Sequence, residues 1–128
     1  MPETHKVFVY GTLREGQSNR GVMTPHLVKQ HGLGRIRGVM YDWGAYPALT
    51  LEEAGEIVGE WVEVTGAGLK ALDRLEDYPH LYQRDIVEDL ENGLRGWVYH
   101  MPAAKARAGG APIPSGDWVW HCLRSRKT

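Results

Sequence analysis

Residues 82–101 read YQRDIVEDLENGLRGWVYHM, and this stretch decides the fold class. It predicts two strands, residues 82–90 and 94–101, because β-branched and aromatic side chains recur in both halves. The Asn92-Gly93 pair between them is the strongest short signal for a hairpin, which joins antiparallel strands. Charged residues interrupt the first strand, whereas the strands of a doubly wound parallel sheet are apolar. We therefore expect an α+β fold whose sheet is at least partly antiparallel.

Other segments extend this sheet. Residues 6–10, KVFVY, predict a central strand that Gly11 ends, and residues 35–43 and 57–64 predict two further strands. Residues 26–31 could form a short helix. Towards the C-terminus we expect a long loop at 102–116, a last strand at 117–123 and a flexible tail at 124–128. A chain of 128 residues has no room for two independent cores, so residues 1–128 are expected to form one domain.

The spacing of apolar residues changes from strand-like to helical after Val64. Thr65 can cap a helix at its N-terminus, and Pro79 forbids its continuation. Between them, leucines recur three residues apart at Leu69, Leu72 and Leu75. This pattern predicts one helix with a buried leucine face.

Glu76 lies on that buried face. With Leu69 at 0° on a helical wheel, Glu76 falls at about 340°, inside the leucine stripe. A carboxylate there is costly unless it is paired or used. Burial and the negative end of the helix dipole both raise its pKa towards the range useful for general acid–base catalysis. An ion pair with Arg84, or a side chain that turns out of a fraying helix end, would explain the same pattern.

Two glycine motifs are candidate binding loops. Tyr10, Gly11, Thr12 and Leu13 follow the first strand, where a glycine can turn successive backbone N–H groups towards one point and create an anion site. An ordinary strand-to-turn transition would give the same letters. Residues 66–71, GAGLKA, fit the outline of a dinucleotide-binding loop. That function requires βαβ units, which the following charged hairpin strand argues against.

Composition excludes several classes of protein. The 15 lysines and arginines against 16 acidic residues give a net charge of −1, which argues against a nucleic-acid partner. Cys122 is the only cysteine, so no intrachain disulfide can form. The six histidines show no zinc-site spacing, and we expect no metal. Neither a signal peptide nor a membrane span is predicted, so a soluble cytoplasmic protein is expected.

Four stretches of the chain together resemble the gamma-glutamylcyclotransferase-like family. They are VFVYGTLR at 7–14, YPAL at 46–49, LDRLEDYP at 72–79 with YQR at 82–84, and PSGDW at 114–118. They occur in the family's order. The resemblance implies a twisted, barrel-like mixed sheet with few helices.

The resemblance also implies an activity. In this family the α-amine of a γ-glutamyl group attacks its own γ-amide carbonyl, which releases 5-oxoproline and a free amine. The resemblance implies that Glu76 is the general acid–base and that Tyr10, Gly11, Thr12 and Leu13 hold the γ-glutamyl group. It implies a small γ-glutamyl amine or peptide as substrate and requires no cofactor. A non-catalytic module that binds a small metabolite in the same pocket is the alternative. The identity of the amine and the oligomeric state stay open.

Overall fold

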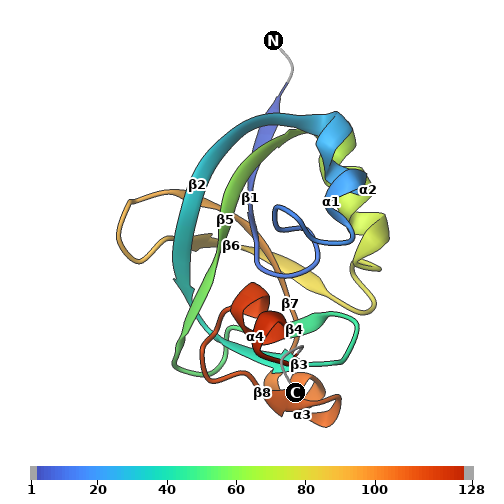
Figure 1. The fold of residues 1–128 in the computed structure, drawn as a ribbon. Helices are drawn as coiled ribbons and strands as arrows, with labels where there is room; N and C mark the ends of the chain where they lie inside the picture. The colour runs from blue at the N-terminus through green and yellow to red at the C-terminus, as the bar shows by residue number, and fades with distance from the viewer. Residues whose placement is uncertain (1–2, 126–128) are drawn as a thin grey trace.

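The computed structural model describes residues 3–125, which form a larger mixed sheet and a smaller antiparallel sheet with short helices at their ends (Figure 1). The larger sheet has the strand order β2-β5-β1-β7-β6. Its strands are β1 (Thr4–Val9), β2 (Leu27–Arg37), β5 (Glu56–Thr65), β6 (Gln83–Glu88) and β7 (Arg95–His100). β1 pairs antiparallel with β5 and parallel with β7, so it is the central strand of a mixed sheet. The predicted central strand and the predicted partly antiparallel sheet are both confirmed.

A smaller sheet and the helices complete the fold. The smaller sheet, in the order β4-β3-β8, contains β3 (Val39–Asp42), β4 (Pro47–Thr50) and β8 (Ala111–Pro112). The helices are α1 (Arg20–Met23), the 3-10 turn η1 (Thr24–His26), α2 (Gly66–Leu75), α3 (Ala103–Ala108) and α4 (Trp118–Ser125). Figure 1 shows α1 and α2 together at one end of the molecule and α3 and α4 at the other, beside the small sheet. No helix in residues 3–125 is long and apolar enough to cross a membrane.

The expected α+β class and mixed sheet with few helices are confirmed, but the sheet is not closed into a barrel. β2 and β6 are its two edges. β2 and β5 curve strongly along their length, as Figure 1 shows, which gives the sheet its wrapped outline. Inside this curve the fully buried Trp61 of β5 packs against Phe8 of β1, with ring centroids 5.2 Å apart in an edge-to-face arrangement. Such aromatic pairs add stabilisation beyond the area that they bury.

The β6–β7 hairpin is confirmed, but its connection is longer than a two-residue Asn-Gly turn. The last paired residues are Glu88 and Arg95, so six residues form the loop. Gly93 occupies the left-handed region with φ of +77°. The loop is built around the buried carboxylate of Asp89. This carboxylate accepts hydrogen bonds from the amides of Arg35 (2.8 Å), Glu91 (2.9 Å) and Asn92 (3.1 Å) and from the indole of Trp61 (2.8 Å).

The segment 102–123 corrects two expectations. The predicted loop at 102–116 contains α3 and β8, and the predicted strand at 117–123 is the helix α4. The carboxylate of Asp117 caps α4 by accepting from the amide of Trp120, 3.2 Å away. Trp118 and Cys122, four residues apart, face the core, whereas Trp120 is 51% exposed. This burial pattern has the period of a helix and not of a strand.

Three further boundaries differ from the expectations. Residues 26–31 do not form a helix, because the chain leaves η1 at His26 and enters β2, which pairs with β5. The expected strand at 35–43 is divided between β2 and β3. α4 continues to Ser125, and residues 126–128 of the expected flexible tail lie outside the described part of the chain.

Candidate active site

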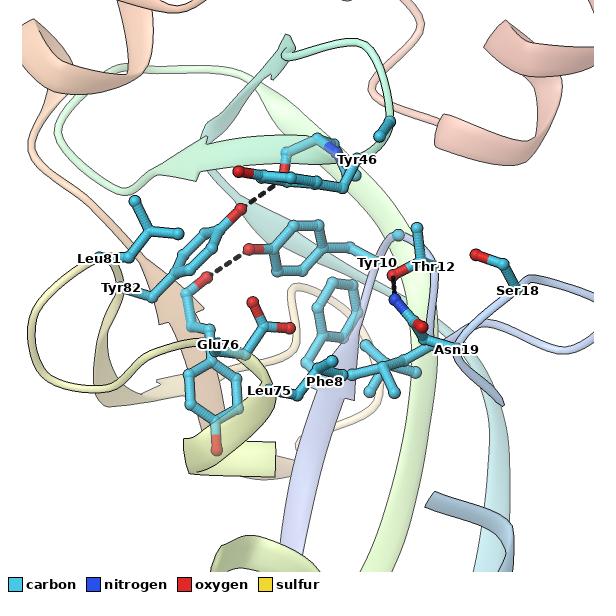
Figure 2. Close-up of a pocket in the computed structure, with 16 residues that line it drawn as sticks. Phe8, Tyr10, Thr12, Ser18, Asn19, Tyr46, Leu75, Glu76, Leu81 and Tyr82 are labelled. Atoms are coloured by element: carbon cyan, nitrogen blue, oxygen red, sulfur yellow. Dashed lines mark hydrogen bonds between the residues drawn. The ribbon is translucent and has the colours of Figure 1, made fainter. Parts of the chain in front are cut away.

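A cavity of about 340 Å³ lies between the end of β1 and the end of α2. It brings together all five residues that were predicted as site residues from the sequence. Figure 2 shows its lining side chains. These are Phe8, Val9, Tyr10, Gly11, Thr12, Leu13, Ser18, Asn19, Ala45, Tyr46, Pro47, Leu75, Glu76, Leu81, Tyr82 and Tyr99.

The turn formed by residues 10–13 lines this cavity and carries free backbone donors. The carbonyl oxygen of Gly11 accepts from the Arg14 amide (3.0 Å), and that of Thr12 accepts from the Asn19 amide (2.8 Å). The Asn19 side chain also donates to the Thr12 hydroxyl at 2.9 Å. Within the described chain, the N–H groups of Gly11, Thr12 and Leu13 have no acceptor. Adjacent unpaired N–H groups of this kind can bind an anion or an oxyanion.

Gly11 is required by a close contact. A Cβ atom at this position would lie 2.6 and 2.7 Å from Cγ and Cδ of Pro47, closer than real Cβ atoms approach their neighbours. Pro47 begins β4, and its carbonyl oxygen accepts from the hydroxyl of Tyr82 at 2.8 Å. The glycine therefore lets the 10–13 turn lie directly against the residue that also positions one wall of the cavity.

Arg14 fixes the 10–13 turn from the side away from the cavity. Its guanidinium is 3.1 Å from the carboxylate of Glu60 and 2.8 Å from that of Asp117, and the residue is 7% exposed. Arg14 does not line the cavity. Its positive charge is neutralised by the carboxylates of Glu60 and Asp117. The sequence contained Arg14 and Asp117 in separate motifs, but nothing in their spacing showed that they would meet.

Glu76 is placed by the way α2 ends. Asp77, with φ of +52°, adopts the left-handed conformation that aspartate tolerates better than most residues. The Tyr78 amide then donates to the Asp73 carbonyl (2.9 Å) and the Asp77 amide to the Arg74 carbonyl (3.2 Å). These two bonds are those of a Schellman motif, which fixes a helix end firmly. Figure 2 shows the resulting position of Glu76, with its carboxylate among the side chains that line the cavity.

The carboxylate of Glu76 is half-buried and unpaired. No group in residues 3–125 donates a hydrogen bond to it or forms an ion pair with it. Burial, which disfavours the charged form, raises its pKa from 4.5 to about 7. Among the described lining residues it is also the one acidic or basic side chain. A glutamate with this pKa can exchange a proton at neutral pH.

The alternative ion pair between Glu76 and Arg84 is not formed. The Arg84 guanidinium instead makes two hydrogen bonds to the Asp73 carboxylate, at 2.8 and 3.3 Å. It lies between the rings of Tyr78 and Trp97, 4.5 and 4.3 Å from their centroids. Asp73 lies one helical turn before Glu76 and does not line the cavity. Arg84 therefore neutralises the carboxylate of Asp73 and leaves that of Glu76 without a counter-charge.

Three tyrosines form a rigid wall around Glu76. Tyr10 donates to the carbonyl of Tyr99 at 2.6 Å, Tyr82 to that of Pro47, and Tyr99 to the carboxylate of Asp73 at 2.7 Å. Burial raises the pKa of each hydroxyl, so all three stay neutral at neutral pH. Sequence reasoning missed Tyr82 and Tyr99 as site residues, because only long-range contacts of the fold bring them beside Tyr10.

The glycine pattern at residues 66–71 is a packing feature and not a nucleotide loop. Thr65 caps α2 by accepting from the Gly68 amide at 3.1 Å, as predicted. A Cβ atom at Gly68 would lie 2.6 Å from Cβ of His26, so this glycine lets α2 lie against η1. In the part of the chain that is described, no three His, Cys, Asp or Glu residues are grouped as metal ligands.

Comparison with known proteins identifies the family of the chain. Residues 7–119 match the family described as gamma-glutamyl cyclotransferase, AIG2-like. The chain belongs to this family. By homology it is therefore a gamma-glutamylcyclotransferase-family enzyme, and the family predicted from its sequence motifs is confirmed.

Individual relatives support the assignment. A Vibrio cholerae protein is 38% identical over 120 residues, which cover 89% of this chain and 95% of the relative. The gamma-L-glutamyl-butirosin B gamma-glutamyl cyclotransferase of Niallia circulans is 37% identical over 102 residues, covering 73% of this chain and 64% of that protein. The crystal structure of an AIG2-like protein from Mus musculus superposes with a TM-score of 0.71 at 28% identity, covering 85% of this chain and 86% of that one.

Proposed function

We propose that this protein converts a γ-glutamyl amine into 5-oxoproline and a free amine, with Glu76 as the proton carrier. The substrate's α-amine nitrogen forms a bond to its own γ-carbonyl carbon, and the bond from that carbon to the leaving nitrogen breaks. Glu76 takes the proton that the ammonium group loses and returns it to the leaving nitrogen. The N–H groups of the 10–13 turn bind the α-carboxylate or the oxyanion that develops on the γ-carbonyl oxygen.

One observation carries this proposal: an unpaired carboxylate with a pKa of about 7 shares a cavity with three free backbone N–H groups. Nucleophile and electrophile belong to one molecule, so the enzyme has to fold the substrate and transfer protons. Such intramolecular reactions gain a large effective molarity when the reacting atoms are held in contact. The walls of Tyr10, Tyr82 and Tyr99 are suited to hold the substrate in the folded conformation.

Product analysis tests the reaction. The purified protein is incubated with a panel of γ-glutamyl amino acids, peptides and alkylamines, and the products are identified by mass spectrometry. We expect 5-oxoproline and free amine in equal amounts from at least one compound. Glutamate as the main product would show a hydrolase instead. Binding of the compounds without any product would show a non-catalytic binding module.

The pH dependence of catalysis follows from the pKa of Glu76. The proposed base must be deprotonated, so kcat/KM should rise about tenfold per pH unit below pH 7 and level off above it. A glutamate with an ordinary pKa near 4.5 would give a profile that is already level at pH 6. Measurement of kcat/KM from pH 5 to 8 distinguishes the two. A level profile across this range would contradict the assignment of Glu76 as base.

Replacement of Gly11 by alanine should weaken the anion site. The added Cβ would overlap the Pro47 ring, so the 10–13 turn has to move away from its position beside the cavity. We expect kcat/KM to fall about tenfold or more, because N–H groups act only when they are aimed at the oxygen they bind. Gly21→Ala is the matched control, since a Cβ at Gly21 in α1 meets nothing within 4 Å. Equal activity of the two variants would argue against the turn as a binding element.

A further inference from the structure

A second cavity of about 480 Å³ adjoins the candidate active site. The two cavities share three lining residues, Thr12, Ser18 and Ala45. Figure 2 shows Thr12 and Ser18 on the side of Tyr10 that is opposite Leu81 and Tyr82. A molecule with one end beside Glu76 can therefore extend past Thr12 and Ser18 into the second cavity.

Trp118 in the wall of the second cavity has an unused hydrogen-bond donor. The residue is 3% exposed, yet its indole N–H has no acceptor among residues 3–125. In that part of the chain, every side-chain nitrogen or oxygen that is inaccessible to solvent has a hydrogen-bond partner. The unpaired indole nitrogen of Trp118 is therefore accessible to solvent. Trp118 is one of the residues that line the second cavity.

Two other indoles of this protein have the acceptor that Trp118 lacks. Trp61 donates to the Asp89 carboxylate at 2.8 Å, and Trp43 donates to the Ala106 carbonyl at 2.9 Å. A ligand that covers this N–H has to supply an acceptor, because a donor that is desolvated without one costs free energy. The indole N–H is a donor only, so the matching group must be an oxygen or another acceptor.

We infer that the second cavity binds the leaving-amine portion of the substrate and that Trp118 donates to an oxygen acceptor on it. This inference rests on the proposed function. The half-buried Gln17, whose side-chain amide has no partner in the described chain, lies in the same wall and adds a second polar contact. The site therefore favours amines that carry a carbonyl or carboxylate oxygen beyond the scissile nitrogen over plain alkylamines.

Two substrates of the same shape test this preference. γ-Glutamyl-β-alaninamide carries a carbonyl oxygen, and γ-glutamyl-isopentylamine has methyl groups in place of the terminal oxygen and nitrogen. We expect wild-type kcat/KM for 5-oxoproline formation to be about tenfold higher with the amide, the size of one hydrogen bond. Trp118→Phe should remove this preference by lowering the value for the amide alone. Trp120→Phe, on the exposed face of α4, is the matched control and should leave the preference unchanged.

A second variant tests the subsite without altering the core. Gln17→Trp fills the second cavity from a loop and should lower kcat/KM for both long substrates about tenfold. γ-Glutamyl-methylamine, whose leaving group is too short to reach Gln17, should be converted at the wild-type rate. The inference is overturned if Trp118→Phe folds and keeps the preference for the amide. It is equally overturned if Gln17→Trp affects the short substrate as strongly as the long ones.

If the proposed function is wrong, the same experiments give a different result. Wild-type protein would then form no 5-oxoproline from any of the three compounds, and their affinities would be compared by titration calorimetry. Tighter binding of the amide that is lost in Trp118→Phe would support the subsite, and equal binding of amide and isopentylamine would overturn it.

Discussion

Replacement of Glu76 by glutamine is expected to lower the rate of 5-oxoproline formation by about 10²-fold or more, the scale of general acid–base catalysis. Glutamine keeps the shape of the side chain and can still form hydrogen bonds, but it cannot carry a proton at neutral pH. The measurement is kcat at saturating substrate, at a pH above 7, where Glu76 is deprotonated in the wild type. Glu91→Gln is the control, because Glu91 is exposed and remote in sequence from the cavity-lining residues of α2.

Glu76→Gln should also change stability, and here we expect it to raise the free energy of unfolding. Burial raises the pKa of Glu76 from 4.5 to about 7, so the folded protein binds more protons than the unfolded chain between these values. The free energy of unfolding of the wild type should therefore fall as pH rises from 4.5 to 7 and stay level above it. At pH 8, Glu76→Gln removes this cost and should be more stable by up to about 3 kcal/mol. Lower stability together with lost activity would mean that Glu76 has a structural role.

The sequence predicted Glu76 because a helix has a simple period. One turn of 3.6 residues is enough to place Glu76 on the leucine face, and the cost of burying a carboxylate then marks it as unusual. The sequence alone left open the alternative that Glu76 forms an ion pair with Arg84. Only the three-dimensional structure shows that the Arg84 guanidinium bonds to Asp73 and leaves Glu76 unpaired.

Other parts of the site depend on contacts between distant residues. The Tyr10 hydroxyl bonds to the Tyr99 carbonyl, 89 positions away, and the register of β1 and β7 brings them together. No local pattern encodes such a pair. The C-terminal helix was missed for a different reason: Trp118-Val119-Trp120 has the composition of a strand, and the capping signal of Asp117 is a single residue.

Replacement of Asp89 by alanine is expected to lower the free energy of unfolding by about 3 to 5 kcal/mol. Asp89 is 5% exposed, and its carboxylate accepts from three backbone amides and from the fully buried indole of Trp61. Alanine leaves these donors without a partner, and each buried, unsatisfied donor costs about 1 to 3 kcal/mol. Denaturant unfolding at pH 7 measures the effect. Glu88→Ala, whose side chain is 63% exposed in the wild type, is the neighbouring control and should change stability by less than about 1 kcal/mol.

The contribution of Asp89 should also depend on pH in a defined direction. Burial raises the pKa of the Asp89 carboxyl, but the hydrogen bonds from Glu91, Trp61, Asn92 and Arg35 outweigh burial and hold it below its ordinary 3.8. A carboxyl with a lowered pKa stabilises the folded state fully above its unfolded value and loses this contribution as pH falls through the folded value. The stability difference between wild type and Asp89→Ala should therefore be level above about pH 5 and shrink in more acidic solution. A difference that stays constant down to pH 2 would show that packing, and not the charged carboxylate, holds the β6–β7 loop.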